Sequence, residues 1–289
     1  PDLSDVEIAA EVQRAIALLG DGHSVLYPFP TDVVRFTYLP LSFYFFSDGL
    51  FVIGAGAGAP PDLVGSRVLA IGGKSTESLL DDLRPFVSRD NDQGLRWIGP
   101  RYLTVIPLLA AMGHEVSPDA VTLTVESASA GRREVVVAAG MPAHGDGLRP
   151  PASLASPPLW LSRVDSSYWH EALPGLDALY VQLNRVRDDE SGPSIADYSA
   201  VLRDDLSRSE LSNVVLDLRH NNGGNNHLIW PLVRALLVHE QADADHRVWV
   251  VTGRGTFSAC QNLINHLERV LERPVFVGAV SSSKPNATG

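Results

Sequence analysis

Residues 250–262 read VVTGRGTFSACQN. A β-branched apolar run ends at glycines, and a cluster of small residues then begins what we expect to be a helix. A strand, a glycine turn and a helix in this order form the repeating unit of an α/β layer. Ser258 falls at the predicted start of the helix. A serine is a common N-cap there, but a helix N-terminus also stabilises negative charge on a nucleophile or an oxyanion. The residues alone leave both interpretations open.

The same alternation extends on both sides of this stretch. Helices are expected near residues 194–208, 227–238 and 258–271. Strand-like runs flank them, and these read ALYVQLN, NVVLDL, RVWVVT and PVFVGAV. Strands that alternate with helices predict an α/β layer in which at least some strands are parallel.

The first half of the chain has a different pattern. Ser4 followed by Glu7 resembles a capping box and predicts a helix over residues 4–19. Aromatic and β-branched residues at 39–53 predict strands around an Asp48-Gly49 turn, and residues 120–139 predict a hairpin that turns near Gly131. The chain is therefore expected to be α/β or α+β. Residues 141–158, rich in Pro, Gly, Ser and Ala, are the expected linker.

Composition excludes several classes of function. The 289 residues carry a formal net charge of −11, which argues against nucleic acid or an anionic membrane surface as a partner, because both require a basic face. No apolar run is long enough to span a membrane. The single cysteine, Cys260, excludes an intrachain disulfide and a thiolate metal cluster. His220 and His227 match no metal motif, so neither a metal nor another cofactor is expected.

A second motif, LDLRHNNGGNN, occupies residues 216–226. Gly223 and Gly224 follow a buried-looking strand, and glycines in such a turn can present backbone N–H groups to a ligand because no Cβ obstructs them. The alternative is a tight turn in which Asn221 and Asn222 bind local backbone groups. The motif by itself favours neither interpretation.

A nucleophilic serine requires a base, because its hydroxyl is weakly nucleophilic. Lys284 lies one helix and one strand after Ser258 and could return beside it, but a lysine base must be kept neutral by burial. His23 is the alternative, since histidine is the residue type that exchanges protons near neutral pH.

Together, DLRHNNGG, TGRGTFSACQN and VGAVSSSKPN resemble the S41 family of serine peptidases, the C-terminal processing (tail-specific) proteases and their tricorn-like relatives. The segment ALLGDGHSVLYP also resembles that family's segment after its first helices. The resemblance implies a crotonase/ClpP-like spiral of ββα units as the catalytic core, with a PDZ-like β domain inserted. It implies an N-terminal helical segment at 1–37, the PDZ-like domain with a helical insertion at 38–140, and the core at 159–289. The family usually continues past the position of Gly289, so the resemblance implies a core that is incomplete at its C-terminus.

By the same resemblance, Ser258 is the nucleophile that forms an acyl-enzyme with a peptide carbonyl. The N–H of Ala259 and one N–H from Gly223-Gly224 form the oxyanion hole. Lys284 is the general base in the Ser-Lys branch, whereas a tricorn-like site would use His23. Two departures bear on Lys284. Ser281, Ser282 and Ser283 stand where relatives often have Thr-Gly-Gly, and Thr288 stands where they often have glutamine.

The expected function is hydrolysis of protein or peptide substrates, near their C-termini, by an exported enzyme. Export rests on the resemblance only. One alternative is a catalytically silent module that binds a peptide or a hydrophobic ligand, with the aromatic run at 41–46 lining its cleft. A weaker alternative is acyl-CoA chemistry on the same spiral. Asn184 and Arg185, at a strand end, are expected to line the cleft.

Overall fold

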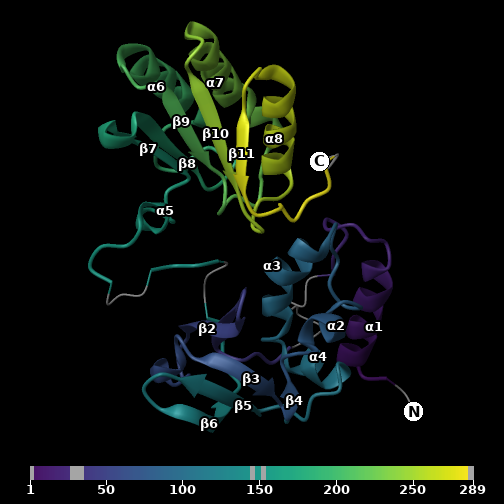
Figure 1. Cartoon of the computed structure of the whole chain (residues 1–289). Coiled ribbons are helices and arrows are strands. Elements are labelled where there is room, and N and C mark those ends of the chain that lie inside the picture. Colours follow the sequence, from purple (N-terminus) through teal and green to yellow (C-terminus); the bar gives the residue numbers. More distant parts are fainter. Residues whose placement is uncertain (1–2, 27–35, 144–146, 151–153, 286–289) are drawn as a thin grey trace. The chain divides into compact units, whose positions relative to one another are not determined.

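The computed structural model describes residues 3–26, 36–143, 147–150 and 154–285. The chain divides into two compact units, residues 1–148 and 149–289 (Figure 1). The division falls within the expected linker, parts of which lie outside the described residues. The domain boundaries implied by the family resemblance stay a prediction.

The first unit is built on an antiparallel sheet. Its strands run in the order β1-β2-β3-β5-β6, and β4 pairs with β3. The strands are β1 (Leu41–Phe46), β2 (Gly49–Ala55), β3 (Arg67–Ile71), β4 (Lys74–Ser75), β5 (Ala120–Ser127) and β6 (Gly131–Ala138). The helices are α1 (Asp5–Ala17), η1 (Pro61–Leu63), α2 (Leu79–Leu83), α3 (Asp92–Tyr102) and α4 (Ile106–Ala111). The expected first helix and both hairpins are confirmed.

Two local signals explain these elements. The capping box of α1 is present, since the Glu7 N–H donates to Ser4 Oγ while the Glu7 carboxylate accepts from the Ser4 N–H. The aromatic run at 41–46 is β1, in which Leu41, Phe43 and Phe45 alternate with half-buried residues and enter the core. Packing in the core, rather than a ligand cleft, accounts for these three side chains.

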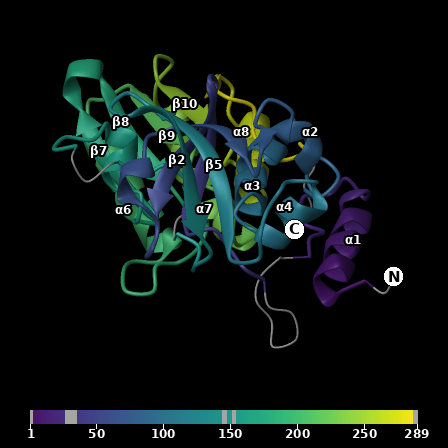
Figure 2. The same ribbon diagram turned by 90° about the horizontal axis from the view of Figure 1, so that it is seen from below.

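The second unit is a five-stranded sheet covered by helices. Its order is β11-β10-β9-β8-β7, in which β8 to β11 are parallel and β7 is an antiparallel edge strand (Figure 1). Figure 2 labels four of these strands, β7 to β10. The strands are β7 (Tyr168–Leu173), β8 (Ala178–Leu183), β9 (Asn213–Asp217), β10 (Arg247–Thr252) and β11 (Val275–Gly278). The helices are α5 (Leu159–Ser162), η2 (Pro174–Leu176), α6 (Ile195–Arg208), η3 (Asn226–Leu228), α7 (Trp230–Ala242) and α8 (Ala259–Val270). The predicted parallel α/β layer is confirmed, but the sequence reading missed β7.

The order of the parallel strands fixes where their helices lie. Each crossover moves one strand along the sheet, and right-handed crossovers in one direction place their helices on one face. Alternate residues of the strands, such as Val214 and Leu216 on β9, join the side chains of α6, α7 and α8 in one core. Cys260, on α8, is fully buried in that core, as expected of a small hydrophobic residue.

A histidine pair lies at the end of α7. The rings of His239 and His246 stack with centroids 4.3 Å apart, and His239 Nε2 is 3.2 Å from the carbonyl oxygen of Ser212. Burial, with the neighbouring His246 adding to it, lowers the pKa of His239. Folding therefore favours the neutral ring.

This pair predicts a pH dependence of stability. Because the pKa of His239 is lower in the folded chain than in the unfolded chain, its contribution is complete above the ordinary histidine value of about 6.5. The contribution is lost as the pH falls below that value. We expect His239→Gln to flatten the fall in unfolding free energy between pH 7 and pH 5, measured by urea unfolding. Exposed His227, changed to Gln, is the matched control, and an equal flattening there would contradict the prediction.

Candidate active site

The carboxyl ends of the parallel strands bring the predicted motifs together. The side chain of Asn221, after β9, donates through Nδ2 to the carbonyl oxygen of Leu183 at the end of β8 (3.0 Å). The Phe257 N–H, after β10, donates to the carbonyl oxygen of Asn221 (3.1 Å). Three loops that are distant in sequence therefore meet at one edge of the sheet, where ligand sites of parallel sheets occur.

Ser258 stands at the N-terminus of α8 in an unusual conformation. Its φ is 57° and its ψ is −126°, and among the described residues only Asp177 is another non-glycine residue with positive φ. The hydroxyl makes no capping hydrogen bond to the helix. A side chain in this region costs on the order of 1–3 kcal/mol, so the surrounding structure must impose the conformation. Ser258 therefore occupies the N-cap position, as predicted, but its hydroxyl does not cap the helix.

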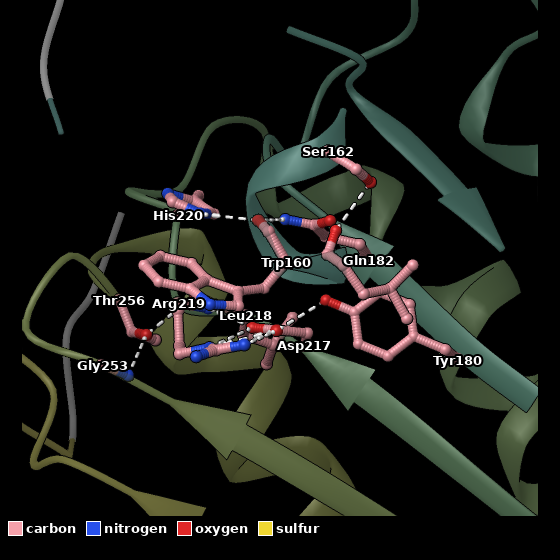
Figure 3. Close-up of polar contacts among 11 residues, drawn as sticks. Trp160, Ser162, Tyr180, Gln182, Asp217, Leu218, Arg219, His220, Gly253 and Thr256 are labelled. Atoms are coloured by element: carbon pink, nitrogen blue, oxygen red, sulfur yellow. Dashed lines mark hydrogen bonds and ion pairs between the residues drawn. The ribbon is translucent and has the colours of Figure 1, made fainter. Parts of the chain in front are cut away.

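Thr256 helps to impose this conformation. Its buried hydroxyl donates to the carbonyl oxygen of Leu218 (2.9 Å) and accepts from the Gly253 N–H (3.0 Å) (Figure 3). The Ser282 N–H donates to the carbonyl oxygen of Thr256 (3.0 Å). The turn before Ser258 is therefore tied both to the end of β9 and to the segment after β11.

The Gly-Gly turn passes directly beside Ser258. A Cβ on Gly223 would lie 2.7 Å from the Cβ of Ser258 and 2.9 Å from the nitrogen of Ala259. A Cβ on Gly224 would lie 2.1 Å from the carbonyl oxygen of Val186, and both glycines have positive φ. Contacts below 3.0 Å are not tolerated, so this approach requires glycine at both positions.

The hydrogen bonds of the turn distinguish its two N–H groups. The Gly223 N–H donates to the side-chain oxygen of Asn221 (2.9 Å), and the Val186 N–H donates to the carbonyl oxygen of Gly223 (2.9 Å). Among the described residues, no protein oxygen accepts from the N–H of Gly224 or of Ala259. The first N–H groups of a helix have no partner within it. Gly224 and Ala259 thus retain donors that a ligand oxygen could use, while the Gly223 N–H is already engaged.

The three serines before Lys284 fix the segment that follows β11. Ser281 Oγ donates to Gln261 Oε1 on α8 (2.6 Å), and Ser282 is buried against the carbonyl oxygen of Thr256. Ser283 Oγ accepts from the N–H of Ser258 (3.2 Å). Ser281, Ser282 and Ser283 therefore attach this segment to the Ser258 turn, a role that was not predicted from the sequence.

The structure places the two candidate bases differently. Lys284 directly follows Ser283, so the segment that carries it adjoins Ser258, but Lys284 itself is exposed. His23 belongs to the first unit, on the turn after α1, with Nδ1 3.8 Å from Asp21 Oδ1. Ser24 Oγ donates to the other oxygen of the same carboxylate (2.6 Å), and this bond is the main cause of the lowered pKa of Asp21. The assignment of His23 rests on the sequence alone.

A polar cluster adjoins the same strand ends (Figure 3). The buried carboxylate of Asp217 accepts from the hydroxyl of Tyr180 (2.7 Å) and from Arg219 Nε (3.0 Å). The guanidinium of Arg219 lies 4.5 Å from the ring centroid of Trp160, and His220 stacks on that ring at 5.2 Å. Burial lowers the pKa of His220 and raises that of Tyr180. These contacts anchor the side chains of the segment just before the Gly-Gly turn.

Other expected site residues also have defined places. Asn184 is buried at the end of β8 and Arg185 is half-buried beside it. In the part of the chain that the structure describes, no three His, Cys, Asp or Glu side chains gather as a metal site would require. From the sequence, Asn221 was predicted only as a local turn residue. Its position directly after a buried-looking strand was the one signal that its side chain could also connect neighbouring loops.

Comparisons with known proteins identify CPAF as a protein of similar fold. No protein-family model matches the chain, and no curated protein does. Mature CPAF complexed with lactacystin is similar with a TM-score of 0.67 and 14% identity, over 98% of this chain and 76% of that chain. Mature CPAF in a second structure gives a TM-score of 0.62 and 15% identity, over 96% and 74%. The photosystem II D1 C-terminal processing protease gives a TM-score of 0.39 and 14% identity, over 97% and 72%.

At these identities the similarity to CPAF shows the fold alone.

No helix among the described residues is long and apolar enough to cross a membrane. The chain is a mixed α/β protein with two sheets and the fold of CPAF, and an S41-family serine peptidase, the family that its motifs resemble, fits this fold.

Proposed function

We propose that this chain is a serine peptidase that hydrolyses peptide bonds of protein substrates through an acyl-enzyme on Ser258. The observation that carries the proposal is the conformation of Ser258. A strained serine whose hydroxyl does not cap its helix, with two N–H donors beside it, is the arrangement of an activated nucleophile. A core serine or a simple cap would not require the strain.

In the proposed mechanism, Ser258 Oγ attacks the peptide carbonyl while a base takes its proton. The carbonyl oxygen becomes an oxyanion, which the N–H groups of Gly224 and Ala259 stabilise, together with the N-terminus of α8. The amine then leaves with a proton, and water releases the acyl group by the reverse sequence. Gly223 contributes space beside the serine, because its own N–H is bonded to Asn221.

The base is either Lys284 or His23. Lys284 follows Ser283, whose hydroxyl accepts from the Ser258 N–H, and Lys284 is exposed. Because lysine bases are found at buried positions, this exposed position is the observation that keeps His23, or a catalytically silent module that binds peptides, as an alternative. The proposal also includes the finer features implied by the family: a crotonase-like core, a PDZ-like domain at 38–140, cleavage near C-termini, and export. The antiparallel sheet of the first unit supports the PDZ-like domain.

The nucleophile is tested with casein and a fluorophosphonate probe. We expect Ser258→Ala to abolish covalent labelling and to lower kcat by at least about 10³-fold, the scale for removing a catalytic serine. Ser207→Ala, an exposed serine on α6, is the matched control. Unchanged cleavage by Ser258→Ala would refute the nucleophile. Neither labelling nor cleavage by the wild type would favour the binding module.

The base is tested by measuring kcat/KM of His23→Ala and Lys284→Ala across pH 6–10. If His23 is the base, its variant loses about 10²–10⁴-fold, as general-base catalysis predicts, while Lys284→Ala stays within a few fold. The reverse pattern assigns Lys284. Retained activity in both variants would exclude each of them as the base.

Asn221 is expected to position the oxyanion donors without touching the substrate. Asn221→Leu loses the acceptor for the Gly223 N–H, whereas Asn221→Asp keeps it. We expect the Leu variant to lower kcat by about 10²-fold with KM nearly unchanged, by analogy with the loss of one oxyanion-hole donor. The Asp variant should recover part of the loss.

Exposed Asn222, changed to Ala, is the control for Asn221. Circular dichroism confirms that each variant is folded. A loss confined to KM would show that Asn221 has no positioning role. An Asp variant as impaired as the Leu variant would assign the effect to the bond from Asn221 Nδ2 to Leu183, which Asp also lacks.

A further inference from the structure

The second unit contains a cavity that the proposed chemistry does not use. Its volume is about 420 Å³. It is lined by the start of the unit and by the loop between α5 and β7, namely Arg149, Pro150, Leu161, Ser162, Arg163, Val164, Asp165 and Ser166. The lining is mostly polar and carries two arginines, in a chain whose net charge is −11.

The charges around this cavity are not balanced. Asp165 is the only carboxylate among the described residues of the lining, and Arg149 binds it through Nη1 (2.9 Å) and Nη2 (2.6 Å). Arg163 meets Glu171 by one contact of 3.4 Å, and Arg185 donates to the main-chain oxygen of Asp165 (3.0 Å). Two guanidinium groups therefore retain donors for a further carboxylate, and planar arginines bind carboxylates in a bidentate manner.

Arg163 is held in place before any ligand arrives. The guanidinium of Arg163 lies over the ring of Trp169, 4.6 Å from its centroid. Asn184, almost fully buried, donates through Nδ2 to the carbonyl oxygens of Arg163 (3.1 Å) and Ser166 (2.9 Å). A preorganised cation loses less conformational entropy on binding than a mobile surface side chain does.

The cavity loop is connected to the proposed active site through the end of β8. Arg185 contacts the loop, and the next residue, Val186, donates its N–H to the carbonyl oxygen of Gly223 and pairs with Gly224. An extended peptide advances about 3.3 Å per residue, so a substrate whose scissile carbonyl lies at Gly224 could extend into this region.

We propose that this cavity is a subsite for a carboxylate of the peptide substrate, bound by Arg163 of its lining together with Arg185, which lies outside the lining and contacts it at Asp165. The carboxylate is either an acidic side chain or the C-terminal carboxylate of the peptide. The inference rests on the proposed peptidase function, because the ligand is taken to be part of a peptide substrate. Binding of the peptide can nevertheless be measured without turnover. In a chain of net negative charge, a local pair of arginines selects acidic ligands that the remaining surface repels.

Binding is measured by fluorescence anisotropy with Ser258→Ala protein, so failure of the peptidase proposal does not affect the result. The probes are labelled peptides of one sequence in three forms: with an internal Glu, with Gln in its place, and with the C-terminus amidated. We expect the carboxylate form to bind about tenfold more tightly than its neutral partner, the effect of charge-assisted hydrogen bonds. A difference in affinity between the Glu and Gln peptides identifies an acidic side chain as the source of the carboxylate. A difference between the free and amidated C-termini identifies the C-terminal carboxylate. Equal affinity of all three forms would overturn the proposal.

Arginine variants then locate the site. Arg163→Gln and Arg185→Gln should each abolish the preference for the carboxylate peptide and leave the affinity of the neutral peptide unchanged. Arg208→Gln, an exposed arginine at the end of α6, is the matched control and should retain the preference. An equal loss of affinity for neutral peptides would indicate a general structural role instead. A preference that persists in both variants would place the carboxylate elsewhere.

Discussion

The close approach of Gly223 to Ser258 is the constraint on which the second unit's candidate site depends. The position of a Cβ on Gly223 is only 2.7 Å from the Cβ of Ser258, so the two loops can adjoin only when that Cβ is missing. The approach places Gly224 on the exposed side of the turn, where its N–H has no acceptor among the described residues. It also brings the turn beside the first N–H of α8. A donor pair and a nucleophile are thereby assembled from two different strand ends.

Holding Ser258 at positive φ requires several independent contacts. The Phe257 N–H is bonded to Asn221, the Ser258 N–H is bonded to Ser283, and the hydroxyl of Thr256 joins two further loops. Each bond contributes on the order of 1 kcal/mol, so a few of them offset the strain of one residue. Such strain is stored where function requires a side chain to project away from its own helix, and the hydroxyl of Ser258 does not cap α8.

Much of this arrangement could be predicted from the sequence. Periodicity gave the helices and most strands, since α6, α7 and α8 each bury one face against alternating strand residues. The motifs around Ser258, Gly223 and Lys284 could be found because each follows a strand. The strand β7 was missed because YWHEAL does not alternate in the usual way: Tyr168 and Trp169 are both buried in succession. The cavity beside Arg163 has no sequence signal, since its lining comes from a loop of irregular composition.

The sequence by itself determined the strand–helix alternation of the second unit and the antiparallel hairpins of the first, because both follow from local hydrophobic periodicity and turn residues. The sequence also determined that glycines occupy positions 223 and 224, directly after a predicted strand. Only the tertiary structure decided that the hydroxyl of Ser258 does not cap its helix, that the Gly223 N–H is bonded to Asn221, and that Lys284 is exposed. These outcomes depend on contacts between residues far apart in the chain, whose geometry no local pattern encodes.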